Sequence, residues 1–231
     1  MLRSLIAFTL LVMLGDAVAV TQSHASPSDG RPLEGIVMPQ RGICAHRGAS
    51  SSHPENTLAA LHEAVRLGAH MVEFDLALTR DGVVVLMHDP KVDRTTNGKG
   101  FVSDLSLDEL KELDAGSWKS TKFRNEKVPT LDEALDILPR NVWLNIHLKG
   151  DKQLARKTVQ SIQAGGRLHQ SFLACGDRAA KAAKDECSDV LICNMDRQRT
   201  GKEYVDTTIE RGTQFIQLLS RRPDSLRYIA E

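Results

Sequence analysis

The stretch Met71-Val72-Glu73-Phe74-Asp75-Leu76 has the pattern of a buried strand that carries two acids on one face. Successive side chains of a β-strand point to opposite faces, so Glu73 and Asp75 project together while the apolar residues around them face the other way. Two carboxylates inside a barrel repel each other, and a bound divalent metal is the simplest compensation. The alternative is an exposed edge strand whose acids are solvated.

Apolar runs alternate with helical stretches on both sides of this strand. Polar titratable residues collect where the early strands end, and no G-x-G-x-x-G phosphate loop follows a strand. These features favour a parallel α/β TIM (β/α)8 barrel over an open doubly wound sheet. The expected strands are 42–46, 70–78, 83–87, 142–148, 168–174, 190–193 and 214–219, and the expected helices are 56–67, 131–138, 151–163, 177–186 and 203–211.

Two features depart from a regular barrel. Residues 91–128 are rich in polar turn residues and predict a small insertion over the barrel mouth after the third strand, with a capping-box pattern at Ser106 and Glu109. The seventh strand-like run lies near the end of the sequence. The roughly 190 residues from 42 onward fall short of the roughly 250 of a typical barrel, so we expect a barrel that lacks its last strand and helix.

The first residues are typical of an export signal. Arg3 precedes an apolar run at 5–14, and small residues at 17–19 or 23–25 suit cleavage. The run is too short to cross a bilayer comfortably, so we expect no stable membrane span and an exported protein, periplasmic or secreted. An uncleaved amphipathic helix is the alternative. The expected boundaries are a signal peptide at 1–25, a linker at 26–40 and a barrel domain at 41–231.

Composition limits the kinds of partner. Among the 231 residues, 30 Lys and Arg balance 30 Asp and Glu, and aromatic residues make up 4%. A formal net charge of +0 gives no global field that attracts nucleic acid, and few rings are available for base stacking. We therefore expect a small polar substrate and no nucleic-acid partner; the sequence indicates no oligomeric state.

The four cysteines lack the spacing of a metal site or a disulfide framework. We expect them to be small buried residues. Because an exported protein can form disulfides, a bridge from Cys187 to Cys175 or to Cys193 stays open.

Two histidines and an arginine follow expected strands. His46-Arg47-Gly48 ends the first strand, and His88-Asp89 follows the third. A guanidinium matches phosphate oxygens with paired hydrogen bonds, and a glycine lets the backbone approach a ligand. Two imidazoles beside a metal-held phosphate suit acid/base cleavage of a phosphodiester. A single histidine at a strand end is more often a surface or capping residue, so the prediction depends on the combination.

Ordered motifs follow one another from residue 42 to 149. The motifs are His46-Arg47-Gly48, Pro54-Glu55-Asn56-Thr57, Glu73-x-Asp75, His88-Asp89, Asp93-Arg94-Thr95-Thr96-Asn97-Gly98-x-Gly100, Asp114-Ala115-Gly116-Ser117-Trp118, Val128-Pro129-Thr130-Leu131-x-Glu133-Ala134 and Asn145-x-x-x-Lys149. This series resembles the glycerophosphodiester phosphodiesterase family. The resemblance implies a TIM barrel with a small insertion, one divalent cation, Ca or Mg, and hydrolysis of glycerophosphodiesters to glycerol 3-phosphate and an alcohol.

The same resemblance assigns roles to individual residues. It makes His46 and His88 the general acid/base pair, without saying which one activates the nucleophile. The nucleophile itself, water or the glycerol hydroxyl, also stays open. The remaining assignments are Arg47 and Lys149 as phosphate-binding groups, Glu73 and Asp75 as metal ligands, and Glu55 as a supporting carboxylate that orients Arg47.

His147 departs from the family pattern, which has a glutamate metal ligand two residues before the lysine. Calcium and magnesium prefer oxygen ligands, whereas imidazole suits zinc and other transition metals. Counting His147 as the third ligand therefore makes Mn or Zn an alternative to Ca or Mg, or weakens metal affinity. The alternative is that His147 is a neutral hydrogen-bond donor beside the site and that water takes the place of the missing ligand.

Two other functions compete with the leading one. The barrel and the acidic pair also resemble sphingomyelinase D-type phospholipases, although the Thr95-Thr96-Asn97-Gly98 motif favours the glycerophosphodiesterases. A catalytically impaired phosphodiester-binding protein is a second alternative, because of His147 and the missing barrel end. Retention of both histidines argues against it.

Overall fold

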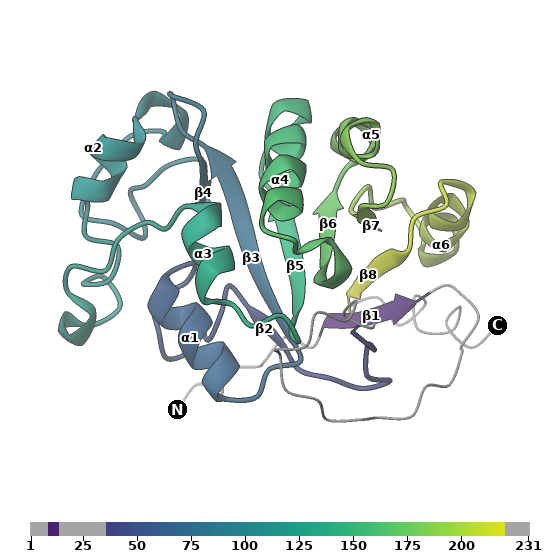
Figure 1. Cartoon of the computed structure of the whole chain (residues 1–231), viewed down its shortest axis with the longest axis horizontal. Coiled ribbons are helices and arrows are strands. Elements are labelled where there is room, and N and C mark those ends of the chain that lie inside the picture. The colour runs from purple at the N-terminus through teal and green to yellow at the C-terminus, as the bar shows by residue number, and fades with distance from the viewer. Residues whose placement is uncertain (1–8, 14–35, 220–231) are drawn as a thin grey trace.

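The structure is a computed structural model that describes residues 9–13 and 36–219. A curled sheet runs through it, and Figure 1 shows helices along its outer face. The strands are β1 (Thr9–Met13), β2 (Cys44–His46), β3 (Met71–Leu78), β4 (Val84–Leu86), β5 (Trp143–Leu148), β6 (Ser171–Cys175), β7 (Leu191–Asn194) and β8 (Phe215–Leu219). The helices are α1 (Leu58–Arg66), α2 (Leu107–Glu112), α3 (Leu131–Ile137), α4 (Lys152–Ala164), α5 (Asp177–Glu186) and α6 (Gly201–Glu210), with short 3-10 helices at Val102–Asp104, Thr121–Phe123 and Leu168–Gln170.

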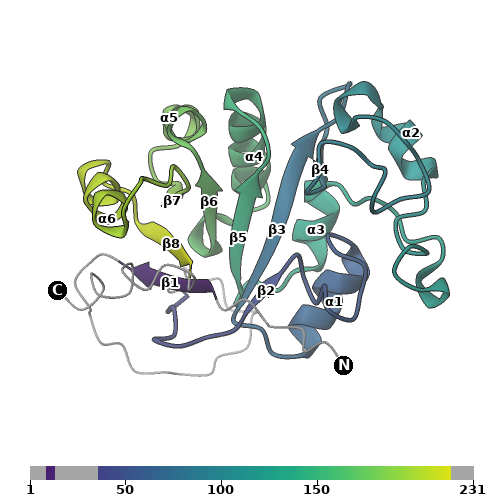
Figure 2. The ribbon, with the colours of Figure 1, turned by 180° about the vertical axis from the view of Figure 1, so that it is seen from behind.

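The sheet is an incomplete parallel barrel, as the sequence predicts. Its order is β1-β8-β7-β6-β5-β3-β2, with β4 beside β3. The strands from β2 through β3 and β5 to β8 are parallel neighbours, whereas β1 pairs antiparallel with β8. Within the described residues, β1 and β2 are the two ends of the sheet and do not pair. In both Figure 1 and Figure 2, helices α3 to α6 follow the outside of the curl.

The strand expected at 83–87 is present, but the prediction that it is the third parallel strand of the barrel is wrong. Residues 84–86 form β4, which pairs antiparallel with β3, with Leu86 opposite Leu76 and Val84 opposite Leu78. A tight turn joins the two strands, and it needs Gly82 at a φ of 75°. Parallel neighbours require a long crossover, which this turn does not provide. The third parallel strand is therefore β5, and the 91–128 insertion follows a hairpin rather than a barrel strand.

The alternating pattern divides the apolar residues between the two faces of the sheet. On β3, Phe74 and the apolar residues beside it pack outward against the helices, while Met71, Glu73 and Asp75 face the inside of the curl. An apolar floor closes the amino-terminal side of the interior, and the acids lie toward the carboxyl ends of the strands. The buried floor residues are Met71, Trp143, Phe172, Ala174, Cys193 and Phe215.

Local capping sets several helix boundaries. The expected helix from 56 begins at Leu58, because Asn56 has a left-handed backbone (φ 56°) and the Thr57 side chain accepts the Ala60 N–H as N-cap. The expected capping box at Ser106 and Glu109 is confirmed on α2. Another box at Thr200 starts α6 at Gly201, earlier than expected. The strand expected from 168 begins at Ser171, after a 3-10 turn.

Strand β1 lies within the predicted signal peptide, although the rest of 1–25 and most of the 26–40 linker lie outside the described residues. The leader therefore stays a prediction. No helix in the described part of the chain has the length and apolar character needed to cross a bilayer.

All four cysteines are free, so neither the Cys187–Cys175 bridge nor the Cys187–Cys193 bridge is formed in this structure. Cys175 and Cys193 are buried as expected, and burial raises the pKa of the Cys175 thiol to about 12. Cys44 and Cys187 are half-buried.

Candidate active site

Parallel pairing brings the predicted residues of three strands to one end of the sheet. On β3, Glu73 lies opposite His46 of β2, and Asp75 lies opposite His147 of β5. Lys149 follows at the end of β5, and its ammonium lies 3.1 Å from Asp75 Oδ1. Adjacent strands in exact register place these groups on one interior surface because side chains on one face repeat every second residue.

The turn after β2 holds Arg47 against the acids. Arg47 and Gly48 both have left-handed backbones, with φ of 57° and 72°. This conformation points the Arg47 N–H at Glu73 Oε2, 2.7 Å away, and leaves the guanidinium 3.3 Å from Asp75 Oδ2. The guanidinium also donates to Glu55 Oε1 at 2.8 Å, which is the contact expected of a carboxylate that orients it.

Asn56 is a site residue that sequence reasoning did not assign a role. Its amide donates to Asp75 Oδ2 at 3.0 Å, and its carbonyl oxygen accepts the Asp75 N–H at 3.1 Å. The pair is buried, so it fixes the rotamer of the carboxylate. Asn56 stands in the quoted Pro-Glu-Asn-Thr motif, but a left-handed residue before a helix cannot be distinguished from a capping residue by sequence alone.

The two acids differ in electrostatic environment. Burial opposes ionisation of Asp75, but the neighbouring His147 ring, the hydrogen bond from Asn56 and the charge of Lys149 outweigh it and hold its pKa well below the usual range. Burial and the neighbouring Asp75 charge raise the pKa of Glu73, although the Arg47 N–H opposes the shift. Glu73 is therefore the carboxylate that most lacks a compensating cation.

Glu73, Asp75 and His147 form a candidate metal centre. Each offers a ligand atom, and these atoms lie within 4.8 Å of one another. His147 Nδ1 is 3.3 Å from Asp75 Oδ1 and 3.8 Å from Glu73 Oε1. Asp75 Oδ1 is buried and has no hydrogen-bond partner, although Lys149 forms an ion pair with it. The residues fit a divalent cation, because a buried acid pair with an oxygen that accepts no hydrogen bond offers hard ligands.

The two histidines occupy different surroundings near this centre. His46 is 64% exposed, its Nε2 lies 3.9 Å from Glu73 Oε2, and partial burial together with the Arg47 charge lowers its pKa. His88 Nδ1 lies 2.6 Å from Asp89 Oδ1. The Asp89 carboxylate accepts hydrogen bonds, mainly from Arg94, that hold its pKa below the usual range, so His88 Nδ1 carries the proton and Nε2 is left as the free ring nitrogen.

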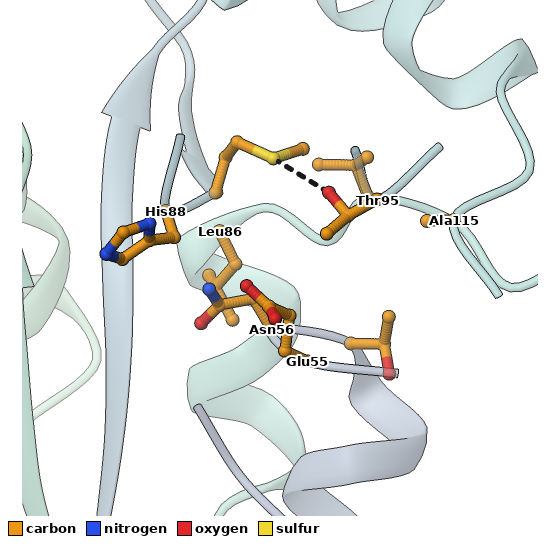
Figure 3. A pocket seen from close by; sticks show the side chains of 9 residues that line it. Glu55, Asn56, Leu86, His88, Thr95 and Ala115 are labelled. Atoms are coloured by element: carbon orange, nitrogen blue, oxygen red, sulfur yellow. Dashed lines mark hydrogen bonds between the residues drawn. The ribbon is translucent and has the colours of Figure 1, made fainter. Parts of the chain in front are cut away.

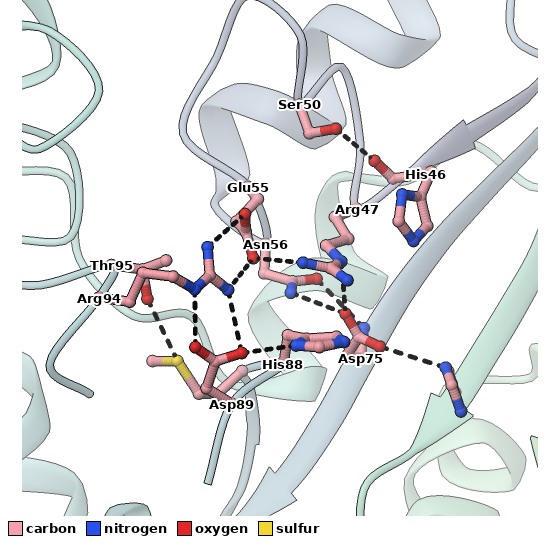
Figure 4. A network of polar contacts seen from close by, with 12 residues as sticks. His46, Arg47, Ser50, Glu55, Asn56, Asp75, His88, Asp89, Arg94 and Thr95 are labelled. Atoms are coloured by element: carbon pink, nitrogen blue, oxygen red, sulfur yellow. Dashed lines mark hydrogen bonds and ion pairs between the residues drawn. The ribbon is translucent and has the colours of Figure 1, made fainter. Parts of the chain in front are cut away.

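Arg94 is a second site residue to which the sequence motifs assign no role. It comes from the 91–128 insertion, and Figure 4 shows it between Glu55 and Asp89. The same view shows Arg47 and Asp75 joined to this network through Glu55. The sequence gives little indication of this role for Arg94, since an arginine in a polar loop is usually a solvated charge.

A small cavity, wide enough for about one water molecule, lies beneath His88. Figure 3 shows it between Glu55 and Asn56 on one side and Thr95 and Ala115 of the insertion on the other. Trp118 of the insertion, 38% exposed, donates its indole N–H to Ala115 O and does not line this cavity.

Sequence comparison identifies relatives. Residues 46–217 match the model of the glycerophosphoryl diester phosphodiesterase family. A putative glycerophosphodiester phosphodiesterase of Bacillus subtilis, YhdW, is 52% identical over 108 residues, which are 47% of this chain and 44% of the relative. The match thus spans less than half the length of that relative.

Solved structures agree with the sequence match. A glycerophosphodiester phosphodiesterase from Agrobacterium tumefaciens is 30% identical with a TM-score of 0.64, covering 69% of each chain. An Oleispira antarctica phosphodiesterase in complex with the product sn-glycerol-3-phosphate is 35% identical with a TM-score of 0.61, covering 67% of this chain and 65% of that one. Since the family match includes both histidine motifs, the acidic pair and the insertion, the chain belongs to the glycerophosphoryl diester phosphodiesterase family.

Proposed function

We propose that the protein is a metal-dependent phosphodiesterase that hydrolyses glycerophosphodiesters, small deacylated phospholipids, to glycerol 3-phosphate and an alcohol. The observation that supports this best is the meeting of two cations, Arg47 and Lys149, with the buried Glu73–Asp75 pair at one strand end. Family membership and the product complex of the Oleispira relative point to the same substrate class.

Phosphate binding is the role we assign to Arg47 and Lys149. Both cations contact Asp75, at 3.3 and 3.1 Å, so they are fixed at the carboxyl end of β3. Cations held in place before substrate binds stabilise charge that develops on phosphoryl oxygens without costly reorganisation. Glu55 keeps the Arg47 guanidinium in its orientation through a 2.8 Å hydrogen bond.

Proton transfer is the role we assign to His46 and His88. One imidazole takes a proton from the nucleophile, and the other gives a proton to the leaving alcohol oxygen. His88 presents Nε2 because Asp89 accepts a hydrogen bond from the Nδ1–H group. His46 is the more exposed of the two and lies beside Glu73.

Glu73, Asp75 and His147 are the residues that would hold the cation. A divalent ion there supplies Lewis acidity toward a phosphoryl oxygen. Two carboxylates favour Ca or Mg, while the imidazole makes Mn or Zn suitable.

Release of glycerol 3-phosphate from glycerophosphocholine and glycerophosphoethanolamine tests the function. We expect chelator-sensitive release by the wild type, and a loss of about 10²–10⁴-fold in kcat for His46→Ala and for His88→Ala. Arg66→Gln is the control, since Arg66 pairs with Glu63 on the surface of α1. Headgroup binding without turnover would favour the binding-protein alternative, and a lipid substrate preferred over its deacylated form would favour the phospholipase alternative.

The metal preference can be tested at His147. We expect His147→Glu to tighten Ca and Mg binding relative to Mn and Zn binding, because a third carboxylate adds charge and an oxygen ligand. Titration calorimetry measures the affinities without turnover. Equal Ca and Mg affinity in both proteins would contradict a ligand role for His147.

Export is a separate proposal that depends on the leader sequence alone. N-terminal sequencing of the protein recovered from fractionated cells should give a start after Ala19 or Ala25, in the periplasm or medium. Recovery with an intact leader in the cytoplasm would contradict it.

A further inference from the structure

Arg94 contacts two carboxylates that come from different parts of the chain. Its Nε and Nη2 donate to Asp89 at 2.7 and 3.1 Å, and its Nη1 and Nη2 donate to Glu55 at 2.9 and 2.7 Å. Glu55 lies 39 residues before Arg94, in the segment that leads into α1. One guanidinium therefore joins the 91–128 insertion to the turn after β2 (Figure 4).

Each of these carboxylates also contacts a residue of the proposed chemistry. Asp89 Oδ1 faces His88 Nδ1 at 2.6 Å, and Glu55 Oε1 accepts from Arg47 Nη1 at 2.8 Å. A single carboxylate thus separates Arg94 from the His88 imidazole on one side, and another separates it from the Arg47 guanidinium on the other.

We propose that Arg94 is a positioning residue that holds the His88 imidazole and the Arg47 guanidinium in fixed relation through Asp89 and Glu55. The catalytic part of this inference rests on the proposed function, but the contacts that it describes can be tested without measuring turnover. The Arg94 side chain is 44% exposed, and its proposed role requires no contact with substrate.

A guanidinium is needed at this position for a geometric reason. Its planar fork offers donors in two directions, so it can hold two carboxylates at once, whereas an ammonium acts as a point charge. Without the cation, Glu55 and Asp89 would repel each other. Arg94 hydrogen bonds lower the pKa of both acids, which keeps them ionised as acceptors.

Other contacts also join the two segments, since the Lys119 ammonium donates to Ser50 O at 2.7 Å and the His53 ring lies 4.8 Å from the Phe123 ring of the insertion. The cavity in Figure 3 separates Glu55 and Asn56 from Thr95 of the insertion, directly beside the ionic bridge. Because neither of these contacts involves Asp89 or Glu55, loss of Arg94 should free Asp89 to rotate away from His88 and should leave Glu55 with Arg47 alone.

The first test measures His88 directly. ¹⁵N NMR of the imidazoles in alkaline buffer, where histidines are neutral, reports which ring nitrogen carries the proton. We expect a single Nδ1–H form of His88 in the wild type and a mixture of tautomers in Arg94→Gln and Arg94→Lys. Arg66→Gln is the matched control, since Arg66 makes a two-pronged pair with Glu63 away from the site. An unchanged His88 spectrum in Arg94→Gln would overturn the inference.

The second test separates the two ends of the bridge by kinetics. We expect Arg94→Gln to lower kcat and raise KM, each by about tenfold. In an Asp89→Asn background it should change only KM, and in a Glu55→Gln background only kcat. A merely structural role would lower kcat and raise KM in every background, in parallel with a fall in melting temperature, and that result would overturn the inference.

The two tests also separate this inference from the proposed function. A folded wild type that releases no glycerol 3-phosphate with any metal would refute the function, while the NMR comparison would still decide the role of Arg94. Turnover by the wild type with an unchanged His88 spectrum and no background-dependent split would refute the role of Arg94 alone.

Discussion

Gly48 shows how one residue shapes the site. It follows Arg47 at a φ of 72°, and a Cβ built on it would lie 2.7 Å from the backbone carbonyl atoms of Ala60 in α1. Only glycine therefore lets the turn after β2 approach α1 closely enough to direct the Arg47 N–H to Glu73.

Gly48→Ala should be strongly destabilising. A left-handed backbone costs about 1–3 kcal/mol for a residue with a side chain, and the clash with α1 backbone adds to this. Gly68→Ala is the control, because Gly68 has a similar φ of 77° with nothing within 4 Å of a built Cβ. Urea unfolding of both variants gives the comparison; an equal loss of stability would show that the clash with Ala60 is relieved without cost.

At the scale of elements, one carboxylate, Asp114, organises the second half of the 91–128 insertion. Asp114 Oδ1 accepts the Gly116 and Ser117 N–H groups, both at 2.8 Å, and Oδ2 accepts the Ser117 hydroxyl at 2.7 Å and the Asn125 N–H at 2.9 Å. These bonds, led by the one from Asn125, hold the Asp114 pKa below its usual range. The insertion thus keeps its shape through polar bonds as well as through a small apolar cluster that it shares with β3 and β4.

Asp114 should make stability depend on pH. Its folded-state pKa is depressed, so its contribution is present above the unfolded value of about 4 and is lost as the pH falls below it. Asp114→Asn should therefore be less stable than the wild type at neutral pH and should lose less stability on acidification. Urea unfolding over a pH series measures both, with Asp185→Asn on the exposed face of α5 as control. A parallel pH dependence in wild type and Asp114→Asn would contradict this assignment.

At the scale of the whole molecule, two cores lie on either side of the curled sheet. The outer core joins sheet and helices, while the inner floor includes Phe172 stacked on Phe215 with ring centroids 4.3 Å apart. Trp143 meets Phe215 edge-on at 5.9 Å. Because the floor lies in the same interior as the acids, with Trp143 and His147 on one strand, it supports the base of the candidate site.

Phe172→Ala should lower the free energy of unfolding by about 3–5 kcal/mol, as expected for a fully buried aromatic ring. Phe101→Ala is the control and should change it by no more than about 0.5 kcal/mol, because Phe101 is 44% exposed on the insertion. Thermal and urea unfolding give both values. A small effect at Phe172 would mean that the floor collapses to fill the cavity, so that it is not the rigid base described above.

The sequence alone determined which side chains share a face and which family the chain resembles. Alternation on 71–76 places Glu73 and Asp75 on one face of their strand, and the motifs single out His46, His88, Arg47, Lys149 and Glu55 as candidate site residues. These predictions are possible because the period of a strand is local, and because ordered motifs record chemistry directly.

Only the tertiary structure decided the rest. The strand at 84–86 has the composition of a barrel strand, and its antiparallel pairing depends on a turn that local pattern does not distinguish from a longer connection. The roles of Asn56 and Arg94 depend on partners 19 and 39 residues away. A polar residue in a loop has no periodicity that marks its partner, because long-range contacts arise only when the packed elements bring the segments together.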